Sequence, residues 1–313
     1  MSLATRAGTL VGGLEAGGTK FVCGVGTGPG DVRCEARFPT TSPEETISRV
    51  IDFFREQRER HGPPAALGIG TFGPAVVDPA SPTYGRIVST PKSGWASVNL
   101  KGVIQEALDL PVAFDTDVNA AALGEWRWGV ARELRTFVYL TVGTGIGGGI
   151  IANGGLLHGF LHPEMGHIPV PHDREADPFE GSCPFHGDCL EGLASGPAMQ
   201  ARWGSPPERL PPEHPAWELE ARYLGLALWS YTNILSPQRI ALGGGIMEQA
   251  HLFPRVRREV RNLSGGYALF PAVSKDSPGG EEPLDDYIVP PALGRRAGLL
   301  GAFALALKLV QER

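Results

Sequence analysis

The chain has 313 residues, a formal net charge of −6 and only four cysteines. This length is typical of two domains, and the acidic balance argues against a protein that binds nucleic acid or an acidic membrane surface through its overall charge. Four cysteines in a chain of this length exclude a disulfide framework, and we expect a cytoplasmic protein because the sequence shows neither a membrane-spanning apolar run nor a secretory signal pattern.

The first predicted element is a β-hairpin over residues 10–26. Its apolar segments flank Gly17 and Gly18, and Thr19 and Lys20 come directly afterwards. An ordinary glycine turn explains this pattern. So does a phosphate-binding turn, because glycine lets backbone N–H groups approach an anion, while Thr19 adds a hydroxyl and Lys20 a positive charge. The spacing of the usual P-loop is absent.

Helices and strands alternate after this hairpin. A helix is predicted over residues 43–61, where Thr41 or Ser42 precedes the helix as its cap and acidic residues occupy the first turn. Three further elements are expected: a buried strand over 65–71, a helix over 99–108 and a strand over 111–114. A sequence that alternates in this way is typical of an α/β protein.

Polar residues follow the strand predicted over 111–114 and precede a helix predicted over 120–128. They include Asp115, Asp117 and Asn119. Because α/β proteins bind ligands at the carboxyl ends of their strands, a carboxylate here is suited to act as general base on a hydroxyl group. Two acids in this position also serve as simple helix caps, and the residues alone leave both interpretations open.

A second glycine hairpin is predicted over residues 135–153, about 125 residues after the first. Its turn consists of Gly143, Thr144 and Gly145. Helices and strands alternate after both hairpins, which indicates an internal duplication into two related α/β halves. Two such hairpins that face one another would hold a polyphosphate from both sides.

A third glycine cluster ends the strand predicted over residues 239–247. It consists of Gly243, Gly244 and Gly245, and lets a flat ligand or a phosphate lie against the backbone. The remaining predicted elements are helices over 216–235 and 295–310, a polar loop over 274–286 and a short strand over 287–290.

The segment 158–196 carries the pattern of a zinc site. Cys183, His186 and Cys189 lie within seven residues, with Gly187 to allow a tight turn. Two thiolates and two imidazoles on short loops suit a tetrahedral structural Zn²⁺ ion. The spacing leaves the fourth ligand open among three histidines: His162, His167 and His172.

Two acids, Glu164 and Glu191, lie beside these candidate ligands. A metal-stabilised loop flanked by carboxylates suggests a loop that positions a substrate.

Taken together, the motifs closely resemble the ROK family of sugar kinases and repressors, and specifically its fructokinase branch. The resemblance extends from Gly12 to about Leu305 and rests on five segments in a fixed order: EAGGTK at 15–20, DTDVNAA at 115–121, VGTGIGG at 142–148, EMGH at 164–167, and residues 183–191. It implies ATP-dependent phosphorylation of D-fructose to fructose 6-phosphate, with Mg²⁺ and a structural Zn²⁺ ion.

The resemblance also implies an actin-like ATPase fold of the ribonuclease H-like type, with two duplicated α/β domains and a cleft between them. We expect the smaller N-terminal domain to comprise residues 1–117 and about 297–313. The larger domain would comprise residues 118–296 and carry the zinc loop at about 158–196.

Site roles follow from the resemblance residue by residue. Asp117 matches the general base of the family. The sugar-binding set is matched by Asn119, Glu164, His167 and Glu191. The ATP-binding loops are matched by Gly17, Gly18, Thr19, Lys20, Gly143, Thr144, Gly145, Gly243, Gly244 and Gly245. The metal ligands are matched by His167, Cys183, His186 and Cys189, so the resemblance selects His167 as the fourth ligand.

Three positions depart from the wider family: Glu15, Thr116 and His186 stand where many members have Asp, Asn and Cys. All three departures are familiar in the fructokinase branch. The alternatives are a kinase for mannose, glucose or an N-acetylated hexosamine, and a sugar-binding regulator without catalysis. The regulator is disfavoured because only about ten residues precede the first hairpin, where the repressors carry a winged helix. We expect a homodimer that binds sugar and ATP, but neither nucleic acid nor a membrane.

Overall fold

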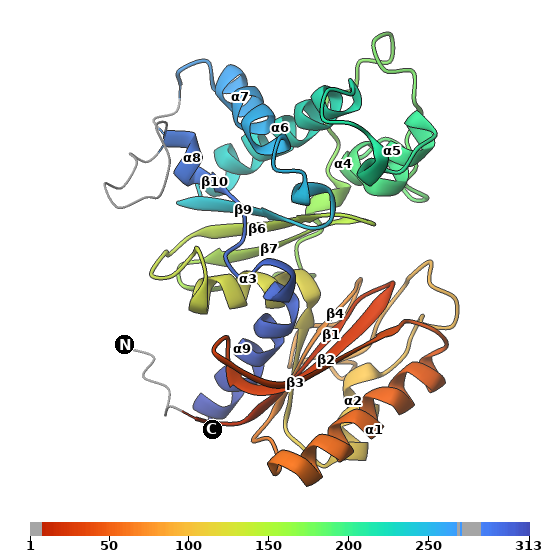
Figure 1. Cartoon of the computed structure of the whole chain (residues 1–313), viewed down its shortest axis with the longest axis vertical. Coiled ribbons are helices and arrows are strands. Elements are labelled where there is room, and N and C mark those ends of the chain that lie inside the picture. Colours follow the sequence, from red (N-terminus) through yellow and green to blue (C-terminus); the bar gives the residue numbers. More distant parts are fainter. Residues whose placement is uncertain (1–7, 268–269, 271–282) are drawn as a thin grey trace. The chain divides into compact units, whose positions relative to one another are not determined.

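The computed structural model describes residues 8–267, 270 and 283–313 (Figure 1). Contacts divide the chain into two compact units. The first comprises the described residues up to Arg132, together with Leu156–Pro163 and Ala292–Arg313, and the second comprises Glu133–Gly155 and the described residues of Glu164–Pro291. Of the polar loop predicted over 274–286, residues 274–282 lie outside the described ranges, and the rest belongs to helix α8 (Pro283–Tyr287).

The first unit is built on a five-stranded sheet with the order β3-β2-β1-β4-β5. Its strands are β1 (Val11–Ala16), β2 (Lys20–Gly28), β3 (Asp31–Pro39), β4 (Leu67–Thr71) and β5 (Val112–Thr116). Strands β1 and β2 form the predicted antiparallel hairpin, whereas β4 runs parallel to β1 and β5 runs parallel to β4. Strands β1 and β4 are almost continuously buried, as expected for strands covered on both faces.

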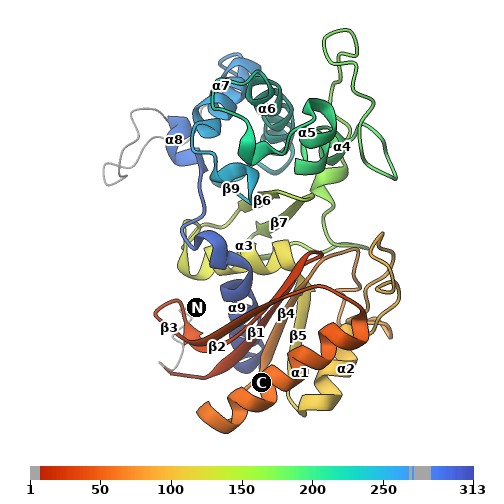
Figure 2. The same cartoon turned by 45° about the vertical axis from the view of Figure 1, so that its right-hand side comes forward.

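Helices cover both faces of this sheet (Figure 2). One face packs against α1 (Pro43–His61) and α2 (Leu100–Leu108), and the other against α3 (Asp117–Trp128) and α9 (Ala297–Gln311). Helix α1 begins as predicted, because the Ser42 side chain accepts a hydrogen bond from the backbone N–H of Glu45. Its buried side chains, among them Val50 and Phe54, join the core beneath the sheet.

Helices α3 and α9 lie close together because glycine leaves room at their contact. A Cβ atom on Gly301 of α9 would lie only 1.9 Å from the carbonyl oxygen of Ala120 in α3. The C-terminal helix thus packs within the first unit. Because α3 packs on α9, the contacts also assign α3 to the first unit, whereas the domain boundary predicted after residue 117 placed it in the second.

The second unit repeats the strand arrangement of the first. Its sheet has the order β10-β9-β6-β7-β8, with β6 (Phe137–Val142), β7 (Ile146–Ala152), β8 (Gly155–Leu156), β9 (Arg239–Gly243) and β10 (Ile288–Val289). Strands β6 and β7 form the second predicted hairpin, β9 runs parallel to β6, and β10 runs parallel to β9. In each sheet, two parallel strands follow on one side of the first hairpin strand, and the second hairpin strand and one further strand follow on its other side. This equivalence confirms the predicted duplication.

The helices of the second unit are α4 (Leu190–Ala194), α5 (Gly196–Trp203), α6 (Ala216–Leu235), α7 (Leu252–Ser264) and α8. Helices α6 and α7 pack on each other, and Leu224 and Leu228 of α6 share a buried core with Val138 and Leu140 of β6. Ahead of α4, the 3₁₀ turn η1 (Met165–His167) packs against β7. No helix in the described part of the chain is long and apolar enough to cross a membrane.

Candidate functional site

Two predicted site segments of the first unit lie at one edge of its sheet. Strands β1, β4 and β5 are parallel, and Ala16, Thr71 and Thr116 are register partners at their carboxyl ends. The glycine turn after β1 and the first residues of α3 after β5 are therefore at the same edge. This is the edge at which open α/β sheets bind their ligands.

Asp115, the first of the two aspartates at this edge, is fully engaged within the protein. Its side chain is buried, with Oδ1 accepting hydrogen bonds from Thr116 N at 2.8 Å and Asn119 Nδ2 at 2.7 Å. Its Oδ2 lies 2.8 Å from His158 Nε2. Because both oxygens have protein partners, Asp115 is poorly placed to accept a proton from a substrate.

Asp117, by contrast, is partly exposed and is the first residue of α3. Its Oδ1 accepts a hydrogen bond from Val118 N at 2.9 Å, which orients the carboxylate at a helix N-terminus, where negative charge is favoured. The helix starts three residues earlier than predicted because the Thr116 hydroxyl caps it by accepting a hydrogen bond from Asn119 N. Of the two acids, Asp117 is the one placed to meet a substrate.

His158 belongs to this network, and sequence reasoning missed its role. Besides its contact with Asp115, its Nε2 lies 3.4 Å from Asn119 Nδ2. The hydrogen bond to Asp115 raises the pKa of His158. The two partners are 43 positions apart in the chain, so no local pattern signals the contact.

The first glycine turn is held by one internal hydrogen bond and by two side chains from outside it, which donate to its carbonyl oxygens. Gly17 N donates to the carbonyl oxygen of Lys20 at 3.0 Å, the Thr40 hydroxyl donates to Gly17 O at 2.8 Å, and Lys92 Nζ donates to Gly18 O. Gly18, Thr19 and Lys20 themselves are exposed. The turn is thus fixed on one side and accessible on the other, as a phosphate-binding turn requires.

The second glycine turn and the third glycine cluster are neighbours in the second unit. Strands β6 and β9 are parallel, so their carboxyl ends adjoin. Gly244 has a φ of +91°, and a Cβ atom there would lie 2.3 Å from the carbonyl oxygen of Val142, the last residue of β6. Gly143 N donates to Gly145 O at 2.9 Å, while Gly143 O accepts from Gly196 N at 2.8 Å.

Glu164 and Glu191 also come together in the second unit. The pKa of Glu164 is raised to about 7, mainly by burial and to a smaller extent by the negative charge of Glu191. Glu191 Oε2 accepts a hydrogen bond from Ile146 N at 2.8 Å, while Glu191 Oε1 lies 4.0 Å from His167 Nε2. Gly145 permits this approach, because a Cβ atom there would lie 2.7 Å from Glu191 Oε2.

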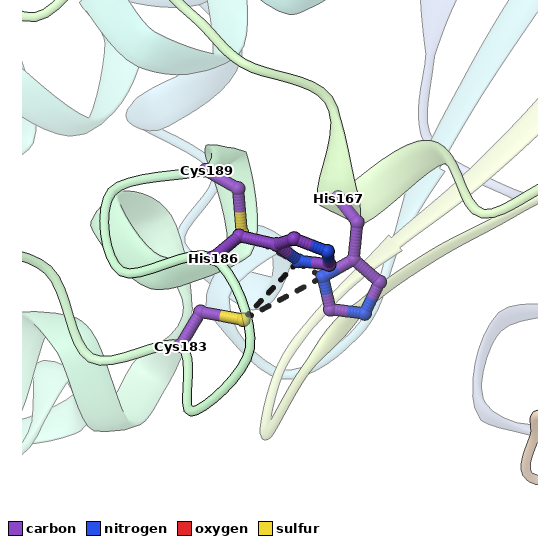
Figure 3. Close-up of side chains that lie close together, drawn as sticks. All are labelled: His167, Cys183, His186 and Cys189. Carbon is purple, nitrogen blue, oxygen red and sulfur yellow. Dashed lines mark hydrogen bonds between the residues drawn. The ribbon is translucent and has the colours of Figure 1, made fainter. Parts of the chain in front are cut away.

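The four predicted metal ligands converge (Figure 3). One ligand atom from each of His167, Cys183, His186 and Cys189 lies within 4.8 Å of the others. The thiol of Cys183 is 3.7 Å from Nδ1 of both histidines, and that of Cys189 is 3.6 Å from Nδ1 of His167. A tetrahedral Zn²⁺ ion with its usual bond lengths separates sulfur and nitrogen ligands by about 3.6 Å. The donor set and its spacing therefore fit Zn²⁺.

The two competing histidines have other partners. His162 Nε2 accepts a hydrogen bond from Ala75 N at 3.1 Å, and burial lowers its pKa. His172 is held between Asp188, 3.0 Å from its Nδ1, and the carbonyl oxygen of Asp177, 2.9 Å from its Nε2. Neither histidine belongs to the cluster, so His167 is the candidate fourth ligand.

Comparison with known proteins agrees with this fold and these motifs. The model of the ROK family matches residues 11–309. A fructokinase of Pediococcus pentosaceus is 39% identical over 297 residues, which cover 95% of this chain and 97% of the relative. A fructokinase of Lactococcus lactis subsp. cremoris is 40% identical over 299 residues, again with 95% and 97% covered.

Among solved structures, a ROK family glucokinase from Streptomyces griseus, in complex with glucose and AMPPNP, has a TM-score of 0.71 and 25% sequence identity. The match covers 96% of this chain and 99% of that one. The predicted actin-like ATPase fold, with its two duplicated α/β halves, is confirmed by this likeness and by the two equivalent sheets. The match to the family model and the identity to full-length relatives show that the chain belongs to the ROK family.

Proposed function

We propose that the chain is an ATP-dependent fructokinase that transfers the γ-phosphoryl group of ATP to O6 of D-fructose. The observation that carries the proposal is the placement of Asp117. It is a partly exposed carboxylate at the N-terminus of α3, at the carboxyl end of β5. The glycine turn after β1 lies at the same edge of the sheet, with β4 between β1 and β5. The fructokinase relatives, which match nearly the whole chain, favour fructose as the sugar.

Asp117 would act as the general base. Phosphoryl transfer depends on positioning and charge neutralisation more than on covalent chemistry, so the protein must orient the attacking hydroxyl and accept its proton. Asp117 Oδ1 accepts a hydrogen bond from Val118 N, which helps to orient the carboxylate. Asp115 supports the same segment, because its hydrogen bonds with Thr116 N and Asn119 Nδ2 hold the start of α3.

Asn119, Glu164, His167 and Glu191 would bind the sugar hydroxyls. Asn119 donates through Nδ2 to Asp115, and its buried Oδ1 has no hydrogen-bond partner among the described residues, so it is suited to accept a bond from a hydroxyl. His167 presents Nδ1 to the two thiols, which leaves Nε2 on the side of Glu191. One imidazole would then serve both the metal and the sugar.

The glycine turns would hold the ATP phosphates. Gly17, Gly18, Thr19 and Lys20 in the first unit, and Gly143, Thr144 and Gly145 in the second, supply backbone N–H groups, hydroxyls and a positive charge. The cluster Gly243–Gly245 would lie on the adenine side. Charge on the phosphates would be neutralised by Mg²⁺, whose ordinary ligands are water and carboxylates.

A structural Zn²⁺ ion held by His167, Cys183, His186 and Cys189 would order the loop that carries Glu164 and Glu191. The chemistry it supplies is a cross-link and not catalysis, because all four positions of a tetrahedral site are then occupied by protein.

A coupled ADP-release assay over D-fructose, D-mannose, D-glucose and the N-acetylated hexosamines tests the proposal. We expect the highest kcat/KM for D-fructose, with the new phosphate on O6 in the NMR spectrum of the product. A higher kcat/KM for another hexose would replace fructose by that sugar. Sugar binding without ADP release by metal-loaded protein would instead favour the non-catalytic regulator.

A further inference from the structure

The metal cluster and the second glycine turn meet at one residue, Ile146. It is the first residue of β7 and directly follows the turn Gly143–Gly145. Its backbone N–H donates to Glu191 Oε2 at 2.8 Å. Its carbonyl oxygen faces Gly166 so closely that a Cβ atom on that glycine would lie 1.9 Å from it. Both polar backbone groups of Ile146 are thus in contact with the segment that carries the metal ligands.

Each contact belongs to an element that supplies one ligand. Gly166 precedes His167 in η1, which is pressed against β7: a Cβ atom on Gly148 of β7 would lie 2.3 Å from Met165 Sδ. Glu191 lies in the first turn of α4, whose N-cap residue is Cys189. Since Cys189 Sγ and His167 Nδ1 are 3.6 Å apart, one ion bound to both would join η1 to α4.

We propose that the metal centre positions the nucleotide-binding turn Gly143–Gly145 through Ile146, independently of the sugar. This inference rests on the proposed function, because it takes the turn as a phosphate site. The ion cross-links the two elements that hold Ile146 from its N–H side and its carbonyl side. Without the ion the turn is less ordered, and nucleotide binding then costs the additional entropy of ordering it.

The coupling is measurable without turnover. In the absence of sugar, we expect metal-loaded protein to bind AMPPNP with Mg²⁺ about tenfold more tightly than metal-free protein, within the ~5–150-fold range typical of coupled sites. Isothermal titration calorimetry gives both Kd values. Coupling between binding sites is reciprocal, so AMPPNP should lower the Kd for Zn²⁺ by the same factor, which competition with a chromogenic chelator measures.

The outcomes separate this inference from the function on which it rests. Equal AMPPNP affinity with and without the ion, in protein that circular dichroism shows to be folded, would overturn the inference and leave the kinase assignment intact. No AMPPNP binding even to metal-loaded protein would refute the phosphate-binding role of the turn itself.

Variants that keep all four ligands test the same link. Gly166→Ala places a methyl group against the carbonyl oxygen of Ile146, and we expect weaker AMPPNP binding with Zn²⁺ still bound. Gly155→Ala is the matched control, because a Cβ atom there meets nothing within 4 Å. We expect this control to bind AMPPNP like the wild type.

Glu191 separates the nucleotide effect from the sugar effect. Glu191→Ala removes the acceptor of Ile146 N and should weaken the binding of both AMPPNP and fructose. Glu191→Gln keeps an oxygen that accepts this hydrogen bond, so AMPPNP binding should recover while fructose binding stays impaired. Wild-type AMPPNP affinity in both Gly166→Ala and Glu191→Ala would overturn the inference.

Discussion

Asp117→Asn removes the proposed base while leaving its structural contact in place. The two side chains have the same shape, and the asparagine oxygen can accept the hydrogen bond that Val118 N donates to Asp117 Oδ1 at 2.9 Å. The cap of α3 is unaffected, because the Thr116 side chain provides it. We expect a folded protein that loses no more than the roughly 0.3–1 kcal/mol contributed by a negative charge in the first turn of a helix.

The loss of turnover should be far larger. A positioned general base contributes about 10²–10⁴ in rate, which corresponds to about 2.7–5.4 kcal/mol of activation free energy at about 1.36 kcal/mol per factor of ten. The KM for fructose should change little, because the amide still hydrogen-bonds to a hydroxyl. A coupled ADP-release assay measures kcat and KM, and urea denaturation of the same preparation measures the free energy of unfolding.

Two further aspartates make this experiment decisive. Asp109 is exposed with a φ of 50°, a conformation that asparagine tolerates, so Asp109→Asn should leave turnover and stability unchanged. Asp115→Asn should lower stability as well as turnover, because its oxygens accept bonds from Thr116 N, Asn119 Nδ2 and His158. Asp117→Asn with a kcat within about threefold of the wild type, far from the loss expected of a base, would show that Asp117 is not the base.

Three other outcomes are expected. Removing the metal with a chelator should raise the KM for fructose, and unchanged kinetics in protein shown by atomic absorption to be metal-free would contradict the role of the loop. Glu125→Ala should lower the free energy of unfolding in urea denaturation by about 1–3 kcal/mol, because the buried Glu125 carboxylate accepts hydrogen bonds from three backbone N–H groups, at Val130, Ala292 and Leu293. The exposed Glu106→Ala serves as control. Asp115 raises the pKa of His158, so this pair stabilises the fold fully below the unfolded-state pKa of about 6.5 and progressively less as the pH rises through the folded-state pKa. His158→Gln should therefore lower the urea midpoint more at about pH 5.5 than at about pH 9, and an equal decrease at both would show that the pair does not titrate as inferred.

Sequence patterns predicted the elements whose residues interact within a few positions. The helix cap at Ser42 and the two glycine hairpins depend on contacts between near neighbours, and each formed where it was predicted. The start of α3 was predicted three residues late, because the hydroxyl of Thr116 was not recognised as the cap. The start of a helix was therefore predicted correctly where its capping residue was identified.

The contacts that select one residue among several equivalent candidates were not predictable from spacing. Three histidines were candidates for the fourth metal position, and the partners that the other two have in the fold leave His167 as the candidate ligand. Ala75, 87 positions away, engages His162, whereas Asp177 and Asp188 engage His172. The pairing of Asp115 with His158 is of the same kind. Such partners are brought together by the fold, so only the resemblance pointed to His167 before the structure did.

Among the described residues, the candidate metal ligands cluster in the second of the two duplicated halves, and the two halves differ in the length of one connection. Strand β3 of the first sheet and strand β8 of the second occupy equivalent positions. The next long helix along the chain is α1 after β3 and α6 after β8. In the first half, residues 40–42 suffice to connect β3 to α1, whereas residues 157–215 connect β8 to α6. Ordering so long a connection costs considerable chain entropy, and its helices α4 and α5 are short. The proposed four-ligand cross-link would offset that cost, because it would join η1 and α4, the elements that hold Glu164, Glu191 and Ile146 in place.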